Sequence, residues 1–325
     1  MTEKGQTING LMRHIRSNHK ITISGASQKR ALRNMGYFHG YKAYRFVKIK
    51  NQVLNFKQFE EVKLTYEFDN SLKTILYPIV MKLETAINNY VIEEVVANSE
   101  TDIENIFKKK LNHHNDFIIG SPEYKKEMGK RLQLKGNIER TIGLNYGKSP
   151  IIQHYLHQNS PIPIWAIFEH TTLGDLGSFI ERMNNTSRES LQKEIGIYDT
   201  SLDSGFQLLS KHIYLIKDLR NAIAHNSPIF DCRFNSGKAS KKMVKHIEKV
   251  TEIKNINFKT ITDYLILCSY YLKILKFSKN EIKGFIRQFE KTVEEFASKI
   301  SNQQNVHKIL GVDVNSKISK LYLFI

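Results

Sequence analysis

The sequence is poor in residues that several protein classes require. Its 325 residues include only two cysteines (Cys232 and Cys268), six prolines and one tryptophan. Two cysteines cannot form a disulfide framework or a cysteine-based zinc site, and they fit a reducing cytosol. The scarcity of proline and glycine excludes collagen-like and linker-like chains, and a hydrophobic content of 41% excludes a disordered one. We therefore expect a folded chain with one large domain or two modest ones.

Long hydrophobic runs are also missing. The longest apolar stretch, residues 264–275, is interrupted by Lys273 and is shorter than the ~20 residues of a membrane-spanning helix. The N-terminus has no apolar segment typical of a secretory signal, and no glycine-rich phosphate-binding motif occurs. The histidine pairs 113–114 and 154/157 have no cysteines or paired carboxylates nearby at the spacing that a metal site requires. We expect a soluble cytoplasmic protein with no metal, no cofactor and no membrane partner.

Acidic residues are few relative to basic ones. The chain has 49 Lys and Arg against 32 Asp and Glu, which gives a formal net charge of +17. Such a surplus favours binding to polyanions, because neutralised phosphates release their counterions. A lysine-rich composition without a polyanionic partner is the alternative. Charge alone does not decide between these two interpretations.

Basic and aromatic residues are interleaved in the first 50 positions, and a second basic group follows at 238–245. Aromatic rings among cations suit stacked, single-stranded bases and a groove that follows the phosphate backbone. The same rings are equally compatible with a hydrophobic core. The candidate RNA-binding residues are Lys29, Arg30, Arg33, Tyr37, Tyr41, Lys42, Arg45 and Lys48.

Helical periodicity dominates the rest of the chain and predicts an all-α protein. Apolar residues recur at helical spacing over 64–97, 162–183, 205–226, 240–252, 258–277 and 279–300. Residues 100–160 are polar and look like helices with a looped insertion. Strand-like alternation is limited to 44–49 and the last few residues. We expect a basic region over 1–60, a helical domain over 61–305 and a C-terminal tail over 306–325.

One helix carries a spacing with chemical meaning. Within 205–226, a helical wheel places the apolar stripe on one side and both Asn221 and His225 on the other. Arg220 lies at the edge of the stripe, about 140° round from His225. An imidazole can move the proton of a 2′-hydroxyl or of a leaving 5′-oxygen, and a guanidinium can hold the phosphate. These residue types are therefore suited to metal-independent RNA cleavage.

The same string also has a plain structural explanation. An arginine that aids solubility and a histidine near the last helical turn would give the same spacing. Two near-matches, Arg13 with His19 and Arg33–Asn34 with His39, have five intervening residues each. The second lies in a segment with Gly36 and Gly40 that is not expected to form one regular helix. We interpret both near-matches as incidental.

Four blocks in order resemble one protein family. Residues 215–231 resemble the Arg-Asn-x-x-x-His signature of HEPN domains, and more narrowly the chain is similar to the Abi-like (AbiD/AbiF) abortive-infection proteins. Residues 31–46 resemble the Gly-Tyr-rich segment of that family, and 66–87 resemble its helix with a glutamate, here Glu84. Residues 163–179 resemble its Pro-x-Trp motif, with Trp165, Glu169 and Gly174. The chain departs from the pattern at Lys73, where arginine is common, and at Asn226, where a second histidine is common.

The resemblance implies an all-α, HEPN-like bundle with additional N-terminal and C-terminal helices. It also implies a metal-independent endoribonuclease toxin that acts against phage-infected cells, distantly related to CRISPR effectors with two HEPN domains. The catalytic residues would be Arg220, Asn221 and His225, with Glu84 as support, and a homodimer would complete the site. Some relatives are encoded beside a structured non-coding RNA, which makes such an RNA an expected partner. The alternative is a non-catalytic RNA-binding module on the same scaffold.

For the motif residues outside the signature we expect structural roles. Trp165 is expected to anchor the core, and Glu169 is expected to pair with a buried arginine. Glu84 is either an ordinary surface glutamate or the group that orients Arg220 or His225. Asp175 is expected to cap the second helix of 162–183.

Overall fold

A computed structural model describes residues 5–48, 52–97, 100–235 and 239–325. The chain is 71% helical, so the expected all-α class is confirmed. The described residues contain a single two-stranded sheet, in which β1 (Phe46–Val47) pairs antiparallel with β2 (Gln52–Val53). Part of the strand expected over 44–49 is therefore present, and Ile49 lies outside the described residues.

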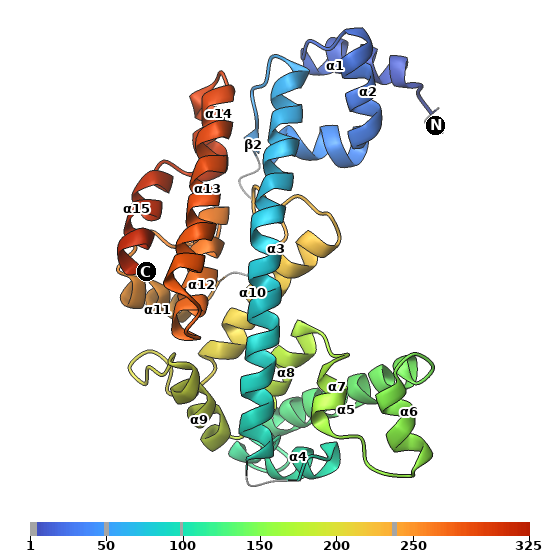
Figure 1. Ribbon diagram of the computed structural model, residues 1–325, viewed down its shortest axis with the longest axis vertical. Helices are drawn as coiled ribbons and strands as arrows, with labels where there is room; N and C mark the ends of the chain where they lie inside the picture. Colours follow the sequence, from blue (N-terminus) through green and yellow to red (C-terminus); the bar gives the residue numbers. More distant parts are fainter. Residues whose placement is uncertain (1–4, 49–51, 98–99, 236–238) are drawn as a thin grey trace.

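One long helix, α3 (Phe59–Val96), is the axis of the molecule. Its 38 residues extend roughly 57 Å and run through most of the length of the fold (Figure 1). The helix begins with a capping box, in which Gln58 and Glu61 satisfy each other's backbone N–H groups. It starts five residues before the expected position and continues past Pro78 to Val96.

The N-terminal residues fold at one end of α3. They form α1 (Ile8–His19), α2 (Gly25–Met35) and η1 (Gly36–Lys42), and η1 is a π-helix. Both α2 and η1 pack against α3. The described residues of the basic region expected over 1–60 thus form three helices and the two short strands before α3 begins (Figure 1).

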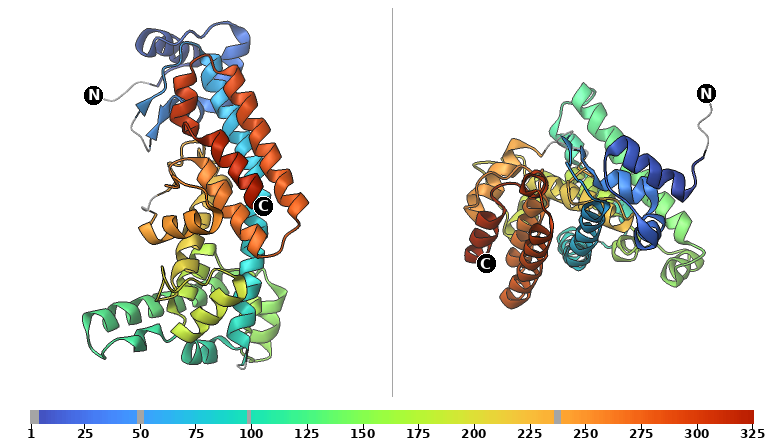
Figure 2. Two further views of the ribbon diagram at one scale, coloured as in Figure 1. Left: turned by 90° about the vertical axis from the view of Figure 1, so that its left-hand side faces the viewer. Right: turned by 90° about the horizontal axis from the view of Figure 1, so that it is seen from above.

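Seven helices, all but α5 short, gather at the other end of α3, and α5 projects sideways from this group (Figure 2). Residues 100–160, expected as helices with a looped insertion, are mostly helical. The elements are α4 (Ile103–Lys109), η3 (His113–Asp116), α5 (Pro122–Asn145), α6 (Pro150–His157), α7 (Ile164–Phe168), α8 (Leu173–Arg182) and α9 (Asn185–Ile195).

Two expectations for the 162–183 region are wrong. Thr172, and not Asp175, is the N-cap of α8; Asp175 is the third residue of the helix and completes a capping box with Thr172. Trp165 is not a core anchor, because 41% of its surface is exposed and its ring meets Tyr155 edge-on. α7 has only five residues, and its buried side consists of smaller aliphatic side chains and Phe168.

The helix that carries the signature, α10 (Leu208–Ala224), packs against α8 and α3. The C-terminal helices then return along α3, where α12 and α13 pack on it (Figure 1). These elements are α11 (Lys241–Thr251), α12 (Ile261–Ile274), α13 (Lys279–Lys299), α14 (Gln303–Leu310) and α15 (Val314–Phe324). The segment expected as a tail, 306–325, is helical, and α15 packs on α12 and α13. The expected C-terminal strand is therefore wrong.

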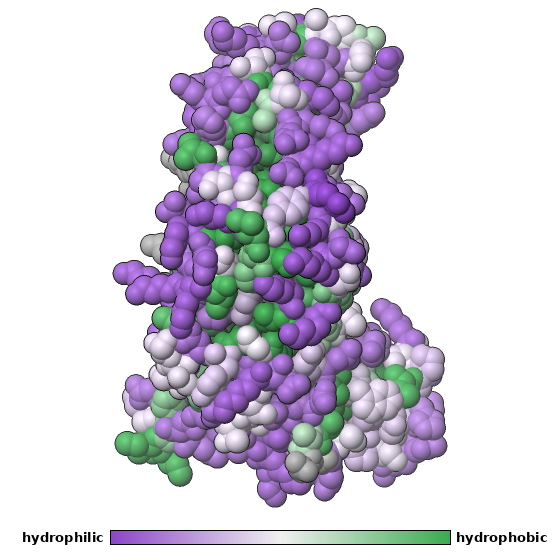
Figure 3. Space-filling model, turned by 60° about the vertical axis from the view of Figure 1, so that its left-hand side comes forward, coloured by the Kyte–Doolittle hydropathy of each residue, from purple (hydrophilic) through white to green (hydrophobic). Residues whose placement is uncertain are grey.

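The outer surface of the C-terminal helices is mostly hydrophilic. In the view that brings this side forward, hydrophobic residues form a narrow central band (Figure 3). In the part of the chain that the structure describes, no helix combines the length and the apolar character needed to cross a bilayer.

Candidate functional site

The end of α10 is fixed by its own backbone. Asn226 has φ 51°, a left-handed conformation that asparagine tolerates better than most residues. Its N–H donates to the Ile223 carbonyl (3.0 Å), and the Ser227 N–H donates to the Ala222 carbonyl (2.8 Å), which is a Schellman motif. This motif leaves His225 as the C-cap residue, with its side chain exposed.

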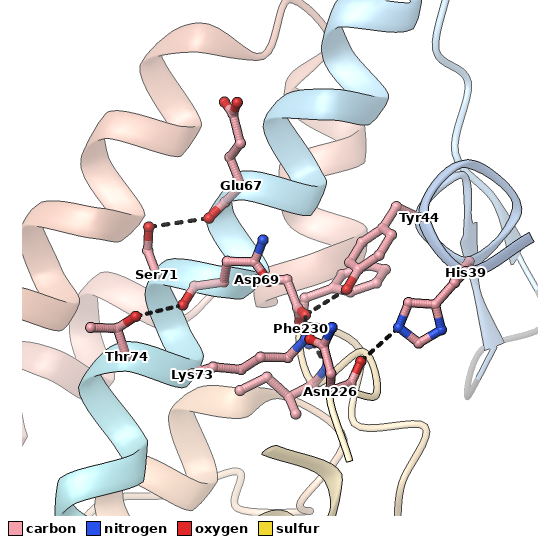
Figure 4. Close-up of polar contacts among 12 residues, drawn as sticks. His39, Tyr44, Glu67, Asp69, Ser71, Lys73, Thr74, Asn226 and Phe230 are labelled. Carbon is pink, nitrogen blue, oxygen red and sulfur yellow. Dashed lines mark hydrogen bonds and ion pairs between the residues drawn. The ribbon is translucent and has the colours of Figure 1, made fainter. Parts of the chain in front are cut away.

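A buried carboxylate holds the segment that follows. Asp69 of α3 is fully buried, and its Oδ1 accepts the N–H groups of Ile229 and Phe230, each at 2.7 Å. Its Oδ2 accepts the Tyr44 hydroxyl at 2.7 Å and pairs with Lys73 Nζ at 2.8 Å (Figure 4). Burial raises the pKa of Asp69, and Lys73, the Tyr44 hydroxyl and the Ile229 N–H oppose that shift. One side chain thus joins α3, the residues after η1 and the segment after α10.

Lys73 extends the same network to the signature. Its Nζ donates to Asn226 Oδ1 at 2.9 Å while it also pairs with Asp69 (Figure 4). The lysine side chain is only 9% exposed. Because Asn226 directly follows His225, Asp69 and Lys73 fix the position at which the histidine emerges.

A second histidine reaches this place from far away in the sequence. His39 of η1 lies 187 residues from Asn226, and its Nε2 is 2.8 Å from the Asn226 carbonyl oxygen (Figure 4). Like His225, His39 is exposed. η1 adopts the wider π-helical turn, and a Cβ on Gly40 would collide with the Met35 carbonyl group. The glycine therefore permits the backbone path that brings His39 to the end of α10.

Arg220 faces a different surface. Its Nε lies 3.3 Å from Glu84 Oε2 of α3, and its side chain is one-third exposed. Both residues line a polar groove of about 460 Å³ between α3 and the connection from α7 to α8, together with Glu169 and His170. Of the two roles open to Glu84, the structure thus favours the one in which its carboxylate accepts the Arg220 Nε–H and orients the guanidinium. No other hydrogen bond of this guanidinium occurs in the described part of the chain.

The three signature residues do not form one cluster in a single chain. The residues that line the groove include Arg220 but neither Asn221 nor His225. Asn221 is half-buried, and its side chain makes no hydrogen bond within the described ranges. Glu169 is exposed and makes no ion pair there, so its expected role as the partner of a buried arginine is wrong. Arg220 thus lies in the groove beside Glu84, whereas His225 lies at the C-terminal end of α10, about 140° round the helical wheel.

The candidate RNA-binding residues differ in exposure. Arg30, Arg33, Lys42 and Lys48 are exposed, and the half-exposed ones are Lys29, Tyr37 and Arg45. Tyr41 is fully buried, and its ring stacks on Tyr37. Its hydroxyl is hydrogen-bonded to His19 Nδ1 at 2.9 Å. Tyr41 is therefore a core residue and offers no face to a base. Of the basic positions noted in the sequence, Lys50 and Lys238 lie outside the described residues.

An exposed aromatic residue lies beside His39 instead. Phe38 is 76% exposed, and Lys42 Nζ lies 4.8 Å from the centre of its ring. Phe38, His39 and Lys42 therefore share the solvent side of η1. In the sequence, His39 is only part of an incidental near-match to the signature, and its pairing with Asn226 has no local signal.

The described residues do not gather metal ligands. Within residues 5–48, 52–97, 100–235 and 239–325, no group of three or more His, Cys, Asp or Glu side chains could hold a metal ion. His113 instead contacts Asp116 (2.8 Å) and Arg188 (3.2 Å). Burial, followed by the charge of Arg188, lowers the pKa of His113.

The chain matches the model of one known protein family. The family model of Abi-like proteins matches residues 30–231, which is more than half of the sequence. This range contains η1, most of the helices around α3, and the whole of α10. The chain belongs to the family of Abi-like proteins, which links it to abortive infection, a bacterial defence. Neither the curated proteins nor the solved structures give a significant match to it.

Proposed function

We propose that this protein is a metal-independent endoribonuclease of an abortive-infection system, with a HEPN-like site on α10. The observation that carries the proposal is the exposed His225 at a rigid helix end, on the same helix as an arginine that Glu84 orients. Family membership supports the defence role. The +17 charge supports a polyanionic substrate in the cytoplasm.

The reaction that these groups suit is an internal transesterification. The 2′-hydroxyl oxygen attacks the neighbouring phosphorus while an imidazole removes its proton, and the bond from phosphorus to the 5′-oxygen breaks. The leaving 5′-oxygen takes a proton from an imidazolium, which yields a 2′,3′-cyclic phosphate and a 5′-hydroxyl. Charge builds on the phosphate oxygens, where a guanidinium stabilises it. His225 is the proton-transfer group and Arg220 the phosphate clamp in this scheme, with Asn221 as a helper.

A homodimer is part of this proposal. Arg220 and His225 of one chain lie on separate surfaces, so one protomer alone does not bring the guanidinium to the imidazole. A second copy supplies Arg220 to the His225 of the first, and the reverse pairing follows from two-fold symmetry. The partly exposed guanidinium, hydrogen-bonded only through its Nε among the described residues, is suited to reaching across such an interface.

The first experiment is cleavage of total RNA by purified, nucleic-acid-free protein in EDTA. The wild type is expected to release fragments with 2′,3′-cyclic ends, and His225→Ala and Arg220→Ala are each expected to lose at least 10²-fold in rate. His154→Ala is the matched control, because His154 is an exposed histidine of α6. Cyclic ends formed equally well by His225→Ala would exclude His225 as the catalyst.

A non-catalytic RNA-binding module is the second candidate. The exposed cations of α2 and η1 favour it, since they form a basic surface apart from Arg220. Binding to a structured RNA should then weaken steeply with salt. Arg30→Ala/Arg33→Ala should reduce the slope of log K against log salt by about 1.4–1.8, whereas Lys125→Ala/Lys126→Ala of α5 should leave it unchanged. Tight binding without any cleavage by the wild type would favour this candidate over the nuclease.

A further inference from the structure

His39 is the one imidazole of the described chain that hydrogen-bonds to the backbone next to His225. Its Nε2 lies 2.8 Å from the carbonyl oxygen of Asn226, the residue that follows His225, so the His39 ring reaches the backbone beside His225. Both side chains are exposed. Two imidazoles on one patch of surface are a natural pair for a reaction that needs one base and one acid.

The hydrogen bond also decides which nitrogen of His39 is available. A backbone carbonyl oxygen can only accept, so Nε2 must carry a hydrogen whether the ring is neutral or charged. Nδ1 makes no hydrogen bond within the described ranges, and it is therefore the atom that gains or loses a proton. An imidazole whose tautomer is fixed by a backbone carbonyl is arranged as an acid–base group.

The position of His39 is fixed by two buried tyrosines that follow it in the sequence. Two residues later, Tyr41 is inserted in the core against His19 and Phe59. Five residues later, Tyr44 donates to Asp69, the carboxylate that also holds the segment after α10. The same buried network thus positions His39 and Asn226 relative to each other (Figure 4).

The residues beside His39 are suited to a nucleotide. Phe38 presents an exposed ring on which a base can stack, and Lys42 lies over that ring with its charge available to a phosphate. π-helical turns are rare and occur often at functional sites. η1 therefore offers an aromatic face, an imidazole and a cation at the end of α10.

We propose that His39 is a second catalytic residue, which shares one site with His225 of the same chain, and that Phe38 and Lys42 bind the nucleotide next to the cleaved bond. This inference rests on the proposed ribonuclease function. One imidazole takes the 2′-hydroxyl proton and the other gives a proton to the 5′-oxygen. Arg220 from a second protomer remains the phosphate clamp, so the dimer supplies the arginine and not the second histidine.

The kinetic test compares His39→Gln and His39→Ala with the wild type over pH 5–9. The glutamine amide can still donate to the Asn226 carbonyl, so it preserves the structural contact but transfers no proton. In both variants kcat should fall 10²–10⁴-fold, and the bell-shaped pH profile should lose one of its two limbs. In His39→Gln the Kd for substrate RNA should change less than twofold. Wild-type cleavage by His39→Gln would overturn the inference, because it would leave His39 with a purely structural role.

A binding experiment decides the inference independently of turnover. The imidazole resonances of His39 and His225 are titrated by NMR, assigned with the single variants, with and without a 3′-mononucleotide as the probe. A phosphate bound between the two rings should raise the pKa of both. A response of His225 alone would exclude His39 from the site, even in a protein that cleaves RNA. A response of both rings without cleavage would retain the shared anion site and reject only the proposed nuclease activity.

Discussion

Asp69 has the widest structural influence of any single residue near the candidate site. Its carboxylate accepts hydrogen bonds from two backbone N–H groups and the Tyr44 hydroxyl and pairs with Lys73, and the residue is fully buried. A buried carboxylate is tolerated only when donors replace its hydration. Asp263 repeats the arrangement on α12, where it accepts the N–H groups of Asn257 and Phe258 and pairs with Lys317. In both places an aspartate on a helix fixes a segment that has no regular structure of its own.

Two departures from the family pattern meet at this network. Lys73 and Asn226 are the two positions at which the sequence departs from the Abi-like pattern that it resembles. In the structure the two side chains are hydrogen-bonded at 2.9 Å. A lysine presents a point charge and an asparagine a single acceptor, so the two substitutions fit each other.

The Asp69→Asn substitution should therefore destabilise the fold strongly. The amide cannot balance the charge of Lys73 and keeps only one oxygen for the buried donors. We expect a loss of about 3–5 kcal/mol in the free energy of unfolding, measured by urea titration. Glu67→Gln, on an exposed side of the same helix, should change stability by less than about 0.5 kcal/mol. A cost for Asp69→Asn as small as that of Glu67→Gln would refute the anchoring role.

At the scale of elements, η1 is the unusual feature. A π-helix seven residues long interrupts what would otherwise be one helix from α2. The two glycines at 36 and 40 make this path possible, since Gly36 has φ 78° and Gly40 has no room for a Cβ. Local helical propensity would favour an α-helical turn here, so the buried Tyr41 and Tyr44 must hold the wider one.

Two glycine-to-alanine replacements should have opposite effects. Gly40→Ala forces a Cβ against the Met35 carbonyl, and we expect a destabilisation of about 1–3 kcal/mol together with reduced RNA cleavage. Gly129→Ala, in an open position of α5, should stabilise by about 0.5–1 kcal/mol because it restricts the unfolded chain. Thermal and urea unfolding of both variants measures the two changes in stability. A stabilised, fully active Gly40→Ala protein would contradict the role assigned to η1.

For the whole molecule, a buried histidine pair joins α10 to the C-terminal helices. His212 of α10 and His246 of α11 are both buried, with ring centres 5.5 Å apart, and His212 Nδ1 lies 2.9 Å from the Tyr271 hydroxyl of α12. Burial, and secondarily the charge that His246 would carry, lowers the pKa of His212 far below its usual value. Burial is also the main cause that lowers the pKa of His246, to about 4.

The fold should consequently lose stability in mild acid. Above pH 6.5 both the native and the unfolded forms of His246 are neutral, and between 6.5 and about 4 only the unfolded form takes up a proton. From pH 7.5 to pH 5.0 this histidine alone should remove about 2 kcal/mol of stability. Urea unfolding at the two pH values should show a smaller loss in His246→Met. An equal loss in both proteins would show that His246 does not carry the effect.

The amino-acid sequence by itself determined the helical content and most of the helix positions. Periodic apolar residues predict α10, α11, α12 and α13 within a few residues, because burial of one helix face is a local, repeating requirement. The separation of Arg220 from His225 also follows from the helical wheel alone. The exact start of α8 could not be read, since Thr172 and Asp175 are both good capping residues and their mutual contact decides between them.

The tertiary structure alone decided which distant residues share a surface. Asp69 meets Phe230 across 161 residues, and His39 meets Asn226 across 187. Helical periodicity relates residues three or four positions apart, so it carries no information about which helix ends come together. The exposure of individual side chains was likewise decided by the tertiary structure. Tyr41 and Phe38 look alike in the sequence, yet Tyr41 is buried and Phe38 faces solvent. That difference arises because the packing of η1 on α3 orients every side chain of the turn at once.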